Sequence, residues 1–430
     1  MGEWENKELS PNLCEIVAGS TPPTSDSIYW EGEHVWITPN DLSNLAGYTI
    51  SDSARKLTLP GVKRATGKLL PANSVVISCR APVGYCAISL VPFSTNQGCK
   101  TLICNGIDEI FLYYVLSKST NALERVSSGT TFLELPKKEL ARFKVSYPTE
   151  KAEQQKIVEV LTTIDEAIDK TRALIKKYTN VKTGMMQDLL ANGIDDKGKI
   201  RTKKTHKYKE SLLGQIPVEW ECVDLFKWSS KQSDSIVDGP FGSNLKLVHY
   251  RDSGIPVIQS GFVTSGTFIA KKYVYVEEAK FKEQYRSRAN PLDIIIAKIG
   301  VQCGRCAVLP KFHPVSIIAG NCIRMTVDSN YNSFLLQEIL SYYYDLGYFD
   351  LIRSVTAQPA INLTKLKAFK VIFMEKEEQR RIYSAFTFVD NKIQAEREYF
   401  TKLQNIKKGL MKDLLTPGRV SVDPLLKKEN

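Results

Sequence analysis

The amino-acid sequence contains one long segment twice, and this duplication constrains the fold more than any other feature. Residues 150–193 and 375–418 align without a gap, at a constant offset of 225. The identical pairs include Gln154 with Gln379, Asp165 with Asp390 and Gly184 with Gly409. Agreement over such a length does not arise by chance, so the chain carries an internal repeat.

Apolar residues in both copies recur in alternating steps of four and three, the pattern of helices that pack along one seam. We therefore predict two amphipathic helices of about 40 residues, roughly 60 Å each. Polar residues interrupt the seam at matched places, which can fix the register of the pair. Gly184 and Gly409 suggest a close backbone approach or a bend. The seam consists of Ile157, Leu161, Ile164, Ile168, Thr171, Ile175, Tyr178, Lys182, Met185 and Leu189, and of Ile382, Phe386, Val389, Ile393, Glu396, Phe400, Leu403, Lys407, Leu410 and Leu414.

Two globular blocks alternate with these helices and share one plan. Each contains short strand-like runs broken by Pro and Gly, then a helix (108–118 or 333–347), a polar loop and a basic segment. The predicted fold class is α+β: two mixed α/β domains separated by two long antiparallel coiled-coil helices, with an internal pseudo-two-fold repeat. The predicted order is block 1–147, helical segment 148–193, basic linker 194–218, block 219–373, helical segment 374–418 and tail 419–430.

Charge and cysteine content narrow the class of protein. A net charge of +11 and a pI of about 9.0 favour a polyanionic partner, although a basic protein without nucleic acid is the alternative. Nine cysteines without a signal peptide indicate reduced thiols in a cytoplasm. Cys303 and Cys306 form a lone CxxC, which indicates packing rather than a zinc site. No apolar run approaches the length of a membrane span, so no membrane partner is expected.

Sequence motifs of common enzymes are missing. The chain has no G-x-x-x-x-G-K-[ST] phosphate loop, no HExxH and no G-x-S-x-G elbow. It also lacks an Asn/Asp-Pro-Pro-aromatic methyltransferase motif and the Pro-Asp pair of common nucleases. We therefore predict that the chain is not an enzyme by itself.

The two copies of the helix stay alike, whereas the two blocks differ greatly in sequence. Loops 19–33 and 233–246 share a position in their blocks and little else. Divergent blocks on a duplicated scaffold are typical of a protein that presents two different reading surfaces. On a basic chain the expected object is duplex DNA, bound by Lys and Arg at phosphates and by polar loop residues at bases.

The helix motifs carry a resemblance to a known family. The openings EKAEQQKI and EKEEQRRI, the endings GMMQDLLANG and GLMKDLLTPG, and the linker phrase LLGQIPVEW resemble the specificity subunit of type I restriction-modification systems. The resemblance covers about residues 3–418. It implies two target recognition domains, each reading one half of a split DNA site, with the helices holding the spacing.

The resemblance also implies the partners. They are double-stranded DNA, two modification subunits that methylate adenine with S-adenosylmethionine, and restriction subunits that hydrolyse ATP. This chain is expected to hold no active site and no cofactor or metal, because S-adenosylmethionine, ATP and magnesium would belong to the partner subunits. The variable blocks cannot be matched residue by residue to a known target.

Candidate contact residues follow from side-chain chemistry. Basic residues near the end of each block are candidates for phosphates, with a solvated basic strand edge as the alternative: Lys137, Lys138, Arg142, Lys144, Lys365, Lys367 and Lys370. Loop residues are candidates for groove edges, with turn chemistry as the alternative: Ser20, Thr21, Thr24, Arg80, Ser243, Asn244, Lys246 and Arg305. Exposed helix faces are candidates for the modification subunits, with a solvated surface as the alternative: Gln154, Arg172, Gln379 and Arg397.

Two other functions stay open from the sequence. One is a coiled-coil adaptor that binds only proteins, which would show no salt-sensitive DNA binding. The other is an unrecognised hydrolase, which would show turnover without partner chains.

Overall fold

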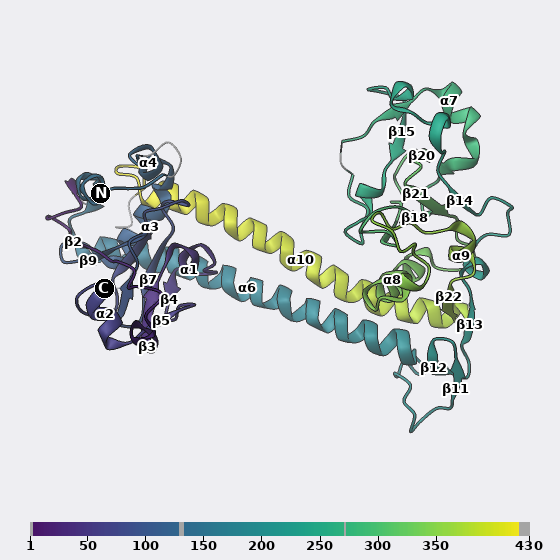
Figure 1. The fold of residues 1–430 in the computed structure, drawn as a ribbon, viewed down its shortest axis with the longest axis horizontal. Coiled ribbons are helices and arrows are strands. Elements are labelled where there is room, and N and C mark those ends of the chain that lie inside the picture. Colours follow the sequence, from purple (N-terminus) through teal and green to yellow (C-terminus); the bar gives the residue numbers. More distant parts are fainter. Residues whose placement is uncertain (1–2, 129–132, 271, 421–430) are drawn as a thin grey trace. The chain divides into compact units, whose positions relative to one another are not determined.

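The computed structural model describes residues 3–128, 133–270 and 272–420 (Figure 1). Two long helices dominate it, α6 (Lys151–Asn192) and α10 (Lys376–Leu414). The chain divides into two compact units, residues 1–176 with 395–430 and residues 177–394. We call them unit 1 and unit 2; each contains one globular domain and the adjoining parts of both helices. Residues 421–430 of the predicted tail lie outside the described part.

Unit 1 contains three sheets. A mixed five-stranded sheet has the order β2-β9-β6-β7-β4, a three-stranded sheet has the order β5-β3-β8, and β1 pairs with β10. The strands are β1 (Trp4–Glu8), β2 (Cys14–Ala18), β3 (Trp30–Ile37), β4 (Thr49–Ile50), β5 (Lys56–Leu57), β6 (Val75–Ser78), β7 (Cys86–Ser89), β8 (Phe93–Thr95), β9 (Cys99–Cys104) and β10 (Lys144–Pro148). The helices are α1 (Pro39–Ser43), α2 (Leu59–Ala65), α3 (Glu109–Lys118), α4 (Thr120–Arg125) and α5 (Lys137–Arg142).

Unit 2 repeats this plan with two four-stranded sheets, β14-β21-β18-β19 and β16-β15-β20-β17, and two strand pairs, β13-β22 and β11-β12. The strands are β11 (Tyr208–Ser211), β12 (Gly214–Pro217), β13 (Glu221–Asp224), β14 (Ile236–Asp238), β15 (Ile255–Ile258), β16 (Tyr275–Val276), β17 (Arg288–Ala289), β18 (Ile294–Ala297), β19 (Cys306–Val308), β20 (Ser316–Ile318), β21 (Cys322–Met325) and β22 (Lys370–Phe373). The helices are α7 (Glu278–Glu283), α8 (Ser333–Asp345) and α9 (Leu363–Lys367).

The two domains correspond strand by strand. Antiparallel β2-β9-β6-β7 in unit 1 corresponds to antiparallel β14-β21-β18-β19 in unit 2. The parallel pair β3-β8 corresponds to the parallel pair β15-β20. The predicted fold class is therefore confirmed, including the internal repeat.

The predicted seam lies on the inner face of both helices. Ile157, Leu161, Ile382 and Phe386 are at most 1% exposed and join the cores of their units. In unit 1 the first part of α6 packs with the last part of α10, and in unit 2 the last part of α6 packs with the first part of α10. The helices are therefore antiparallel in both units, as predicted.

The two lysines that interrupt the seam form ion pairs. In unit 1 Lys407 lies 2.6 Å from Asp165, which also accepts a 2.7 Å hydrogen bond from the Tyr114 hydroxyl. In unit 2 Lys182 lies 2.9 Å from Asp390 and 3.3 Å from Glu338 of α8. The repeat thus places the same Lys–Asp pair once in each unit.

Gly184 and Gly409 do not mark a close backbone approach, so that part of the prediction is wrong, while the alternative of a bend stays a prediction. A Cβ atom added at Gly184 or Gly409 would meet nothing within 4 Å in the described structure. Each position therefore lies open on its helix.

The linker after α6 is more ordered than a solvated basic loop. Strands β11 and β12 form a hairpin, and Arg201 is buried against Glu378 of α10. Glu378 also accepts a 2.9 Å hydrogen bond from the backbone N–H of Ile194. Arg201 is thus a linker cation that holds the chain to the helix instead of facing solvent.

Candidate nucleic-acid interface

Four loop segments meet at one edge of the unit 1 domain. The N–H of Cys79 donates to the carbonyl of Gly98 at 2.7 Å, and the N–H of Leu135 donates to the carbonyl of Cys79 at 2.7 Å. The hydroxyl of Thr21 contacts Gln97 at 2.5 Å. We call the edge formed by residues 19–21, 96–98, 79–80 and 134–135 rim 1.

Unit 2 builds the same edge with the same backbone hydrogen bonds. The N–H of Lys298 donates to the carbonyl of Asn321 at 2.9 Å, and the N–H of Ile361 donates to the carbonyl of Lys298 at 2.9 Å. Residues 239–241 complete the edge. We call the segments 239–241, 319–321, 298–299 and 360–361 rim 2.

A glycine allows the first loop of each rim to approach the sheet. A Cβ atom on Gly19 would lie 2.0 Å from the carbonyl oxygen of Thr95. A Cβ atom on Gly239 would lie 2.0 Å from the carbonyl oxygen of Ala319. Any larger residue would push the loop away, so both rims depend on a glycine at the equivalent place.

The side chains on the two rims differ. Rim 1 presents Thr21, Gln97 and Arg80, whose guanidinium lies 3.1 Å from Glu134. Rim 2 presents Phe241, which is 49% exposed, with the ammonium of Lys298 at 3.8 Å from its ring centroid. The edges therefore share a backbone frame and offer different chemistry.

The ammonium of Lys298 is held in place by a carboxylate. Its side chain is only 11% exposed, and its Nζ lies 2.9 Å from Asp238 at the end of β14. The candidate residues predicted from the sequence do not include Lys298, Phe241, Gln97 or Glu134. Lys298 and Phe241 become a pair only through the contact of two loops, so no local sequence signal marks them.

A cluster of two arginines lies beside rim 2. Arg305 and Arg353 both lie over the ring of Tyr344, at 4.1 and 4.7 Å from its centroid. Arg305 also pairs with Asp345 at 2.8 Å. The cluster joins the β18–β19 loop to the end of α8, so Arg305 is anchored to a helix and not free in its loop.

Most of the predicted phosphate contacts lie on short helices that follow the rims directly. Lys137, Lys138 and Arg142 are exposed on α5, and Lys365 is exposed on α9. The alternative of a basic strand edge therefore applies only to Lys144 and Lys370, which begin β10 and β22. Lys370 is paired with Asp224 at 2.7 Å, and Lys367 lies 5.9 Å from the ring of Phe226.

The α5 and α9 cations are not at matched positions. When Phe143 is aligned with Phe369, Lys137 falls opposite Leu363 and Lys365 falls opposite Glu139. The helices correspond, but each copy acquired its own cations.

The remaining loop candidates lie in different environments. Ser20 donates to the carbonyls of Arg64 and Ala65 at 3.0 Å, a long-range contact with the last turn of α2 rather than turn chemistry. Thr24, Asn244 and Lys246 are exposed beyond the rims. The side chain of Ser243, and residues 129–131 of the polar loop, lie outside the described part of the chain.

The expected exposure of two helix candidates is wrong. Gln154 and Gln379 are each 1% exposed. Gln154 accepts from the N–H of Asp108 at 2.9 Å and donates to the carbonyl of Pro148 at 2.8 Å. Gln379 makes the same two contacts in unit 2, with Asn332 at 3.1 Å and Met374 at 2.9 Å. Both amides hold a helix to its domain, because they continue the buried seam by one heptad.

The arginine candidates are exposed on the helices. Arg172 donates to Asp169 at 2.6 Å and to the carbonyl of Ala46 at 2.8 Å. Arg397 is exposed on α10. Of the four partner-binding candidates, only these two therefore keep an accessible side chain.

The CxxC thiols are packed in the unit 2 core. Cys303 donates to the carbonyl of Lys298 at 3.0 Å. Burial raises the pKa of Cys303 to about 11 and that of Cys306 to about 12. Both thiols are therefore protonated near neutral pH, a poor state for metal binding.

No helix within residues 3–128, 133–270 and 272–420 combines the length and apolar character that crossing a bilayer requires.

Comparison with known proteins places these features in context. A family model described as the type I restriction modification DNA specificity domain matches residues 1–178 and 243–405. The type I restriction enzyme MjaIX specificity subunit of Methanocaldococcus jannaschii is 27% identical over 98% of this chain and 95% of its own length. The EcoR124I/EcoR124II specificity subunit of Escherichia coli is 31% identical over 38% of this chain and 41% of its own length.

Solved structures share the fold. The S subunit of a type I restriction-modification system from M. genitalium has a TM-score of 0.58 at 16% identity, covering 96% of both chains. A chain from a study of complex assembly and conformational transition of the type I system has a TM-score of 0.59 at 16% identity, covering 97% of this chain and 98% of its own.

Proposed function

The chain belongs to the family of type I restriction-modification DNA specificity subunits, and we propose that each of its globular domains reads one half of a split DNA site. Chains of this family are non-catalytic, and the catalytic activities belong to other subunits. The finer assignment concerns which surfaces of this chain meet the two half-sites.

The observation that supports this proposal is the pair of rims. The same backbone hydrogen bonds join four loops in each domain, while the side chains on them differ. A conserved frame with changed side chains is suited to docking in one way on two different sequences. Exposed cations on α5 and α9 follow the frames and would anchor each domain at phosphates, which position a protein without reading sequence.

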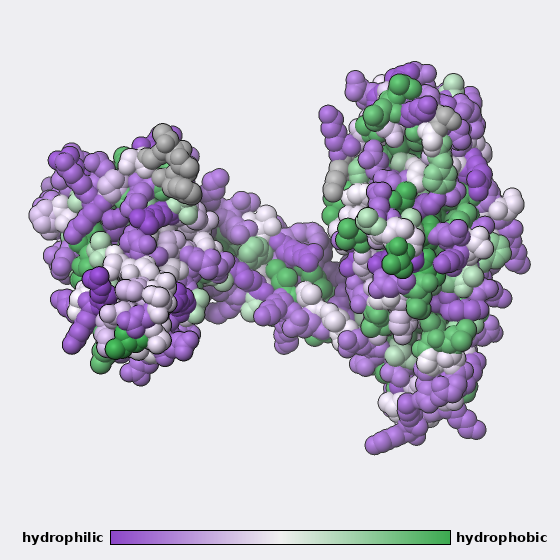
Figure 2. Space-filling view, in the orientation of Figure 1, coloured by the Kyte–Doolittle hydropathy of each residue, from purple (hydrophilic) through white to green (hydrophobic). Residues whose placement is uncertain are grey.

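The chemistry of each rim indicates how it would read bases. Rim 1 offers an amide, a hydroxyl and a guanidinium, the groups that hydrogen bond with base edges. Two apolar tips flank rim 2, Val301 at 81% and Val355 at 103% exposure, on loops that are joined by the bridge between Ile299 and Ala360. Figure 2 shows hydrophobic residues interspersed with hydrophilic ones on the face of unit 2 that it presents. Apolar contact with thymine methyl groups is the expected use of such tips.

We also propose that α6 and α10 set the spacing between half-sites. Removing residues 164–170 and 389–395, one heptad from each helix, preserves the seam and shortens the pair by about 10 Å. The preferred gap should then shrink by about three base pairs at 3.4 Å each. Binding to DNA sites that differ only in the gap measures this, and an unchanged preferred gap in a folded, binding protein contradicts it.

The proposed partners complete the complex. Two modification subunits would dock on the helices and supply S-adenosylmethionine, and restriction subunits would supply ATP and magnesium. Arg172 and Arg397 are the accessible candidates on the helices for the modification subunits.

The experiment that tests independent reading exchanges one domain. Residues 1–147 are replaced by the corresponding block of another specificity subunit, and methylated adenines are mapped in host DNA. One half of the methylated motif should change and the other half should stay. A change in both halves, or in neither, would overturn independent reading. Hosts carrying the unaltered chain and no chain provide the controls.

A further inference from the structure

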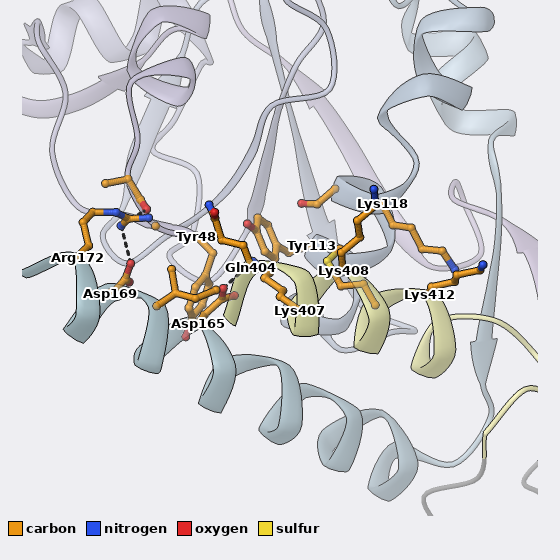
Figure 3. Close-up of a pocket in the computed structure, with 15 residues that line it drawn as sticks. Tyr48, Tyr113, Lys118, Asp165, Asp169, Arg172, Gln404, Lys407, Lys408 and Lys412 are labelled. Carbon is orange, nitrogen blue, oxygen red and sulfur yellow. Dashed lines mark hydrogen bonds and ion pairs between the residues drawn. The ribbon is translucent and has the colours of Figure 1, made fainter. Parts of the chain in front are cut away.

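A cavity of about 620 Å³ opens inside unit 1, between the domain and the two long helices (Figure 3). The loop at Ala46–Tyr48 and helix α3 form one wall, and α6 and α10 form the other. Its volume falls within the range of small-molecule sites, about 300–1,000 Å³. Two seam residues, Ile168 and Lys407, line the cavity, whereas no residue of rim 1 does.

The charges in the cavity do not balance. Arg172 is paired with Asp169, and Lys407 is paired with Asp165, each at 2.6 Å. Lys118, Lys408 and Lys412 also line the cavity. Lys118 donates to the carbonyl of Leu415 at 2.9 Å and to the hydroxyl of Thr416 at 2.7 Å, both neutral groups, and in the described part of the chain none of the three lysines has an ion-pair partner. Three lysines therefore share one cavity without a matching anion.

The unbalanced lysines lie together. Figure 3 shows Lys118, Lys408 and Lys412 toward one end of the cavity, and the Arg172–Asp169 pair at the other. Lys408 and Lys412 are one turn apart on α10, and Lys118 ends α3. Burial, and secondarily Arg419, lowers the pKa of Lys118. An anion bound at this end would offset the repulsion between Lys118 and Arg419.

Two tyrosines form the central wall. The rings of Tyr48 and Tyr113 have centroids 5.7 Å apart at an angle of 41°, and Tyr113 is 8% exposed. Figure 3 shows both between the lysine end and Arg172. Aromatic faces beside an anion-binding end suit a ligand with a planar ring and a phosphate group.

The second copy of the repeat shows that the fold does not need these lysines. At the offset of 225, Lys408 and Lys412 correspond to Thr183 and Gln187, whereas Lys407 corresponds to the retained Lys182. Aligning the caps of α3 and α8, Asp108 and Asn332, places Tyr342 opposite Lys118. Unit 2 thus keeps the structural ion pair and lacks all three unpaired cations.

We propose that this cavity binds a small phosphorylated ligand of the nucleotide class, with its phosphates at Lys118, Lys408 and Lys412 and its ring against Tyr48 and Tyr113. Lysine is a point-charge binder of phosphate, and the tyrosine wall distinguishes a nucleotide from a free phosphate. The site is separate from the rims, so the proposal does not depend on how DNA is read.

The test uses the full chain and isothermal titration calorimetry with ADP, inorganic pyrophosphate and adenosine as probes. ADP should bind more tightly than pyrophosphate, and adenosine should bind least. The variant K408T/K412Q carries the residues of the second copy at two exposed positions, so the fold should be kept. It should weaken ADP binding by roughly 10- to 100-fold, about 1.4–2.7 kcal/mol, because two of the cations that would contact the phosphates are lost.

The matched control removes two charges outside the cavity. Lys176 and Lys402 are exposed on the same helices in unit 1 and do not line the cavity. The variant K176Q/K402Q should bind ADP as the unaltered chain does. Y48L should reduce ADP binding toward that of pyrophosphate and leave pyrophosphate binding unchanged.

Three results would overturn the proposal. The first is no binding of ADP or pyrophosphate by the unaltered chain, and the second is an equal loss in the control variant. The third is that K408T/K412Q weakens DNA binding or assembly with the modification subunit, although the unaltered chain does not bind ADP. That result would assign the lysines to DNA or to an acidic partner segment.

Discussion

Units 1 and 2 are two copies of one internal repeat, and they differ most in their exposed loops. Strand order, the parallel central pair and the rim hydrogen bonds agree between them. Rim 1 is lined by polar groups, whereas rim 2 contains an exposed phenylalanine and is flanked by two exposed valines. Side chains at an edge can change without disturbing the backbone that presents them, so the repeat could keep its frame while its reading surfaces diverged.

The buried polar contacts show a second difference. The equivalent carboxylates Glu153 and Glu378 are both buried, at 3% and 4% exposure. The indole N–H of Trp4 donates to Glu153 at 3.3 Å, whereas Arg201 and the N–H of Ile194 donate to Glu378. Each unit thus satisfied the same buried group with the neighbours that its own sequence supplied.

The largest effect is expected at the Arg201–Glu378 contact. R201M leaves a buried carboxylate without its cation, which costs about 3–5 kcal/mol. We expect the unfolding free energy of unit 2 to fall by that amount, measured by urea denaturation. W4F, which removes the corresponding donor in unit 1, should cost about 1–2 kcal/mol. A smaller loss in R201M than in W4F would contradict the comparison.

The seam lysines should differ in importance. K182M leaves Glu338 and Asp390 without a shared cation, whereas K407M leaves Asp165 still bonded to the Tyr114 hydroxyl. Because the sites are partly exposed, we expect losses of about 2–3 kcal/mol and about 1 kcal/mol. Urea denaturation of both variants measures them, and equal losses would mean that Tyr114 does not compensate.

The loss of unfolding free energy in K182M should depend on pH. Burial raises the pKa of Glu338 above its ordinary value of 4.5, and Lys182 opposes that shift. Without Lys182 the folded state binds a proton more tightly than the unfolded state, so stability falls as pH rises through the folded pKa. The loss should therefore be smaller at pH 5 than at pH 7. A loss that grows on acidification would contradict this assignment.

The α5 and α9 lysines should affect DNA binding unequally. K137A/K138A removes two exposed cations and should flatten the salt dependence of binding by about 0.9 per lost phosphate contact, for every DNA sequence. K365A/K367A should have less effect, because Lys367 lies near the Phe226 ring. Salt titrations of the assembled complex measure both, and unchanged slopes would remove these lysines from the interface.

The smallest effect is expected at the open glycines. G184A and G409A place a methyl group where nothing lies within 4 Å, so each should raise the unfolding free energy by up to about 1 kcal/mol. Both copies should respond equally in thermal denaturation. Destabilisation by either variant would indicate that the added methyl group meets another part of the chain at that face of the helix.

The sequence by itself determined the repeat, the two helices and their seam. These features are periodic, so the positions of Ile157 or Phe386 already state which face is buried. Extending the seam by one heptad would also have found the burial of Gln154 and Gln379. Local signals also located one helix in each domain, α3 within the predicted 108–118 and α8 within the predicted 333–347.

Only the tertiary structure decided which distant residues meet. The rims join four loops that are separate in sequence, Arg201 reaches a helix 177 residues away, and the cavity gathers lysines from α3 and α10. Such contacts depend on how sheets and helices pack, and packing leaves no periodic trace in a loop. The fold therefore determines which side chains meet at the edges of the domains. The sequence pattern by itself determines the two long helices.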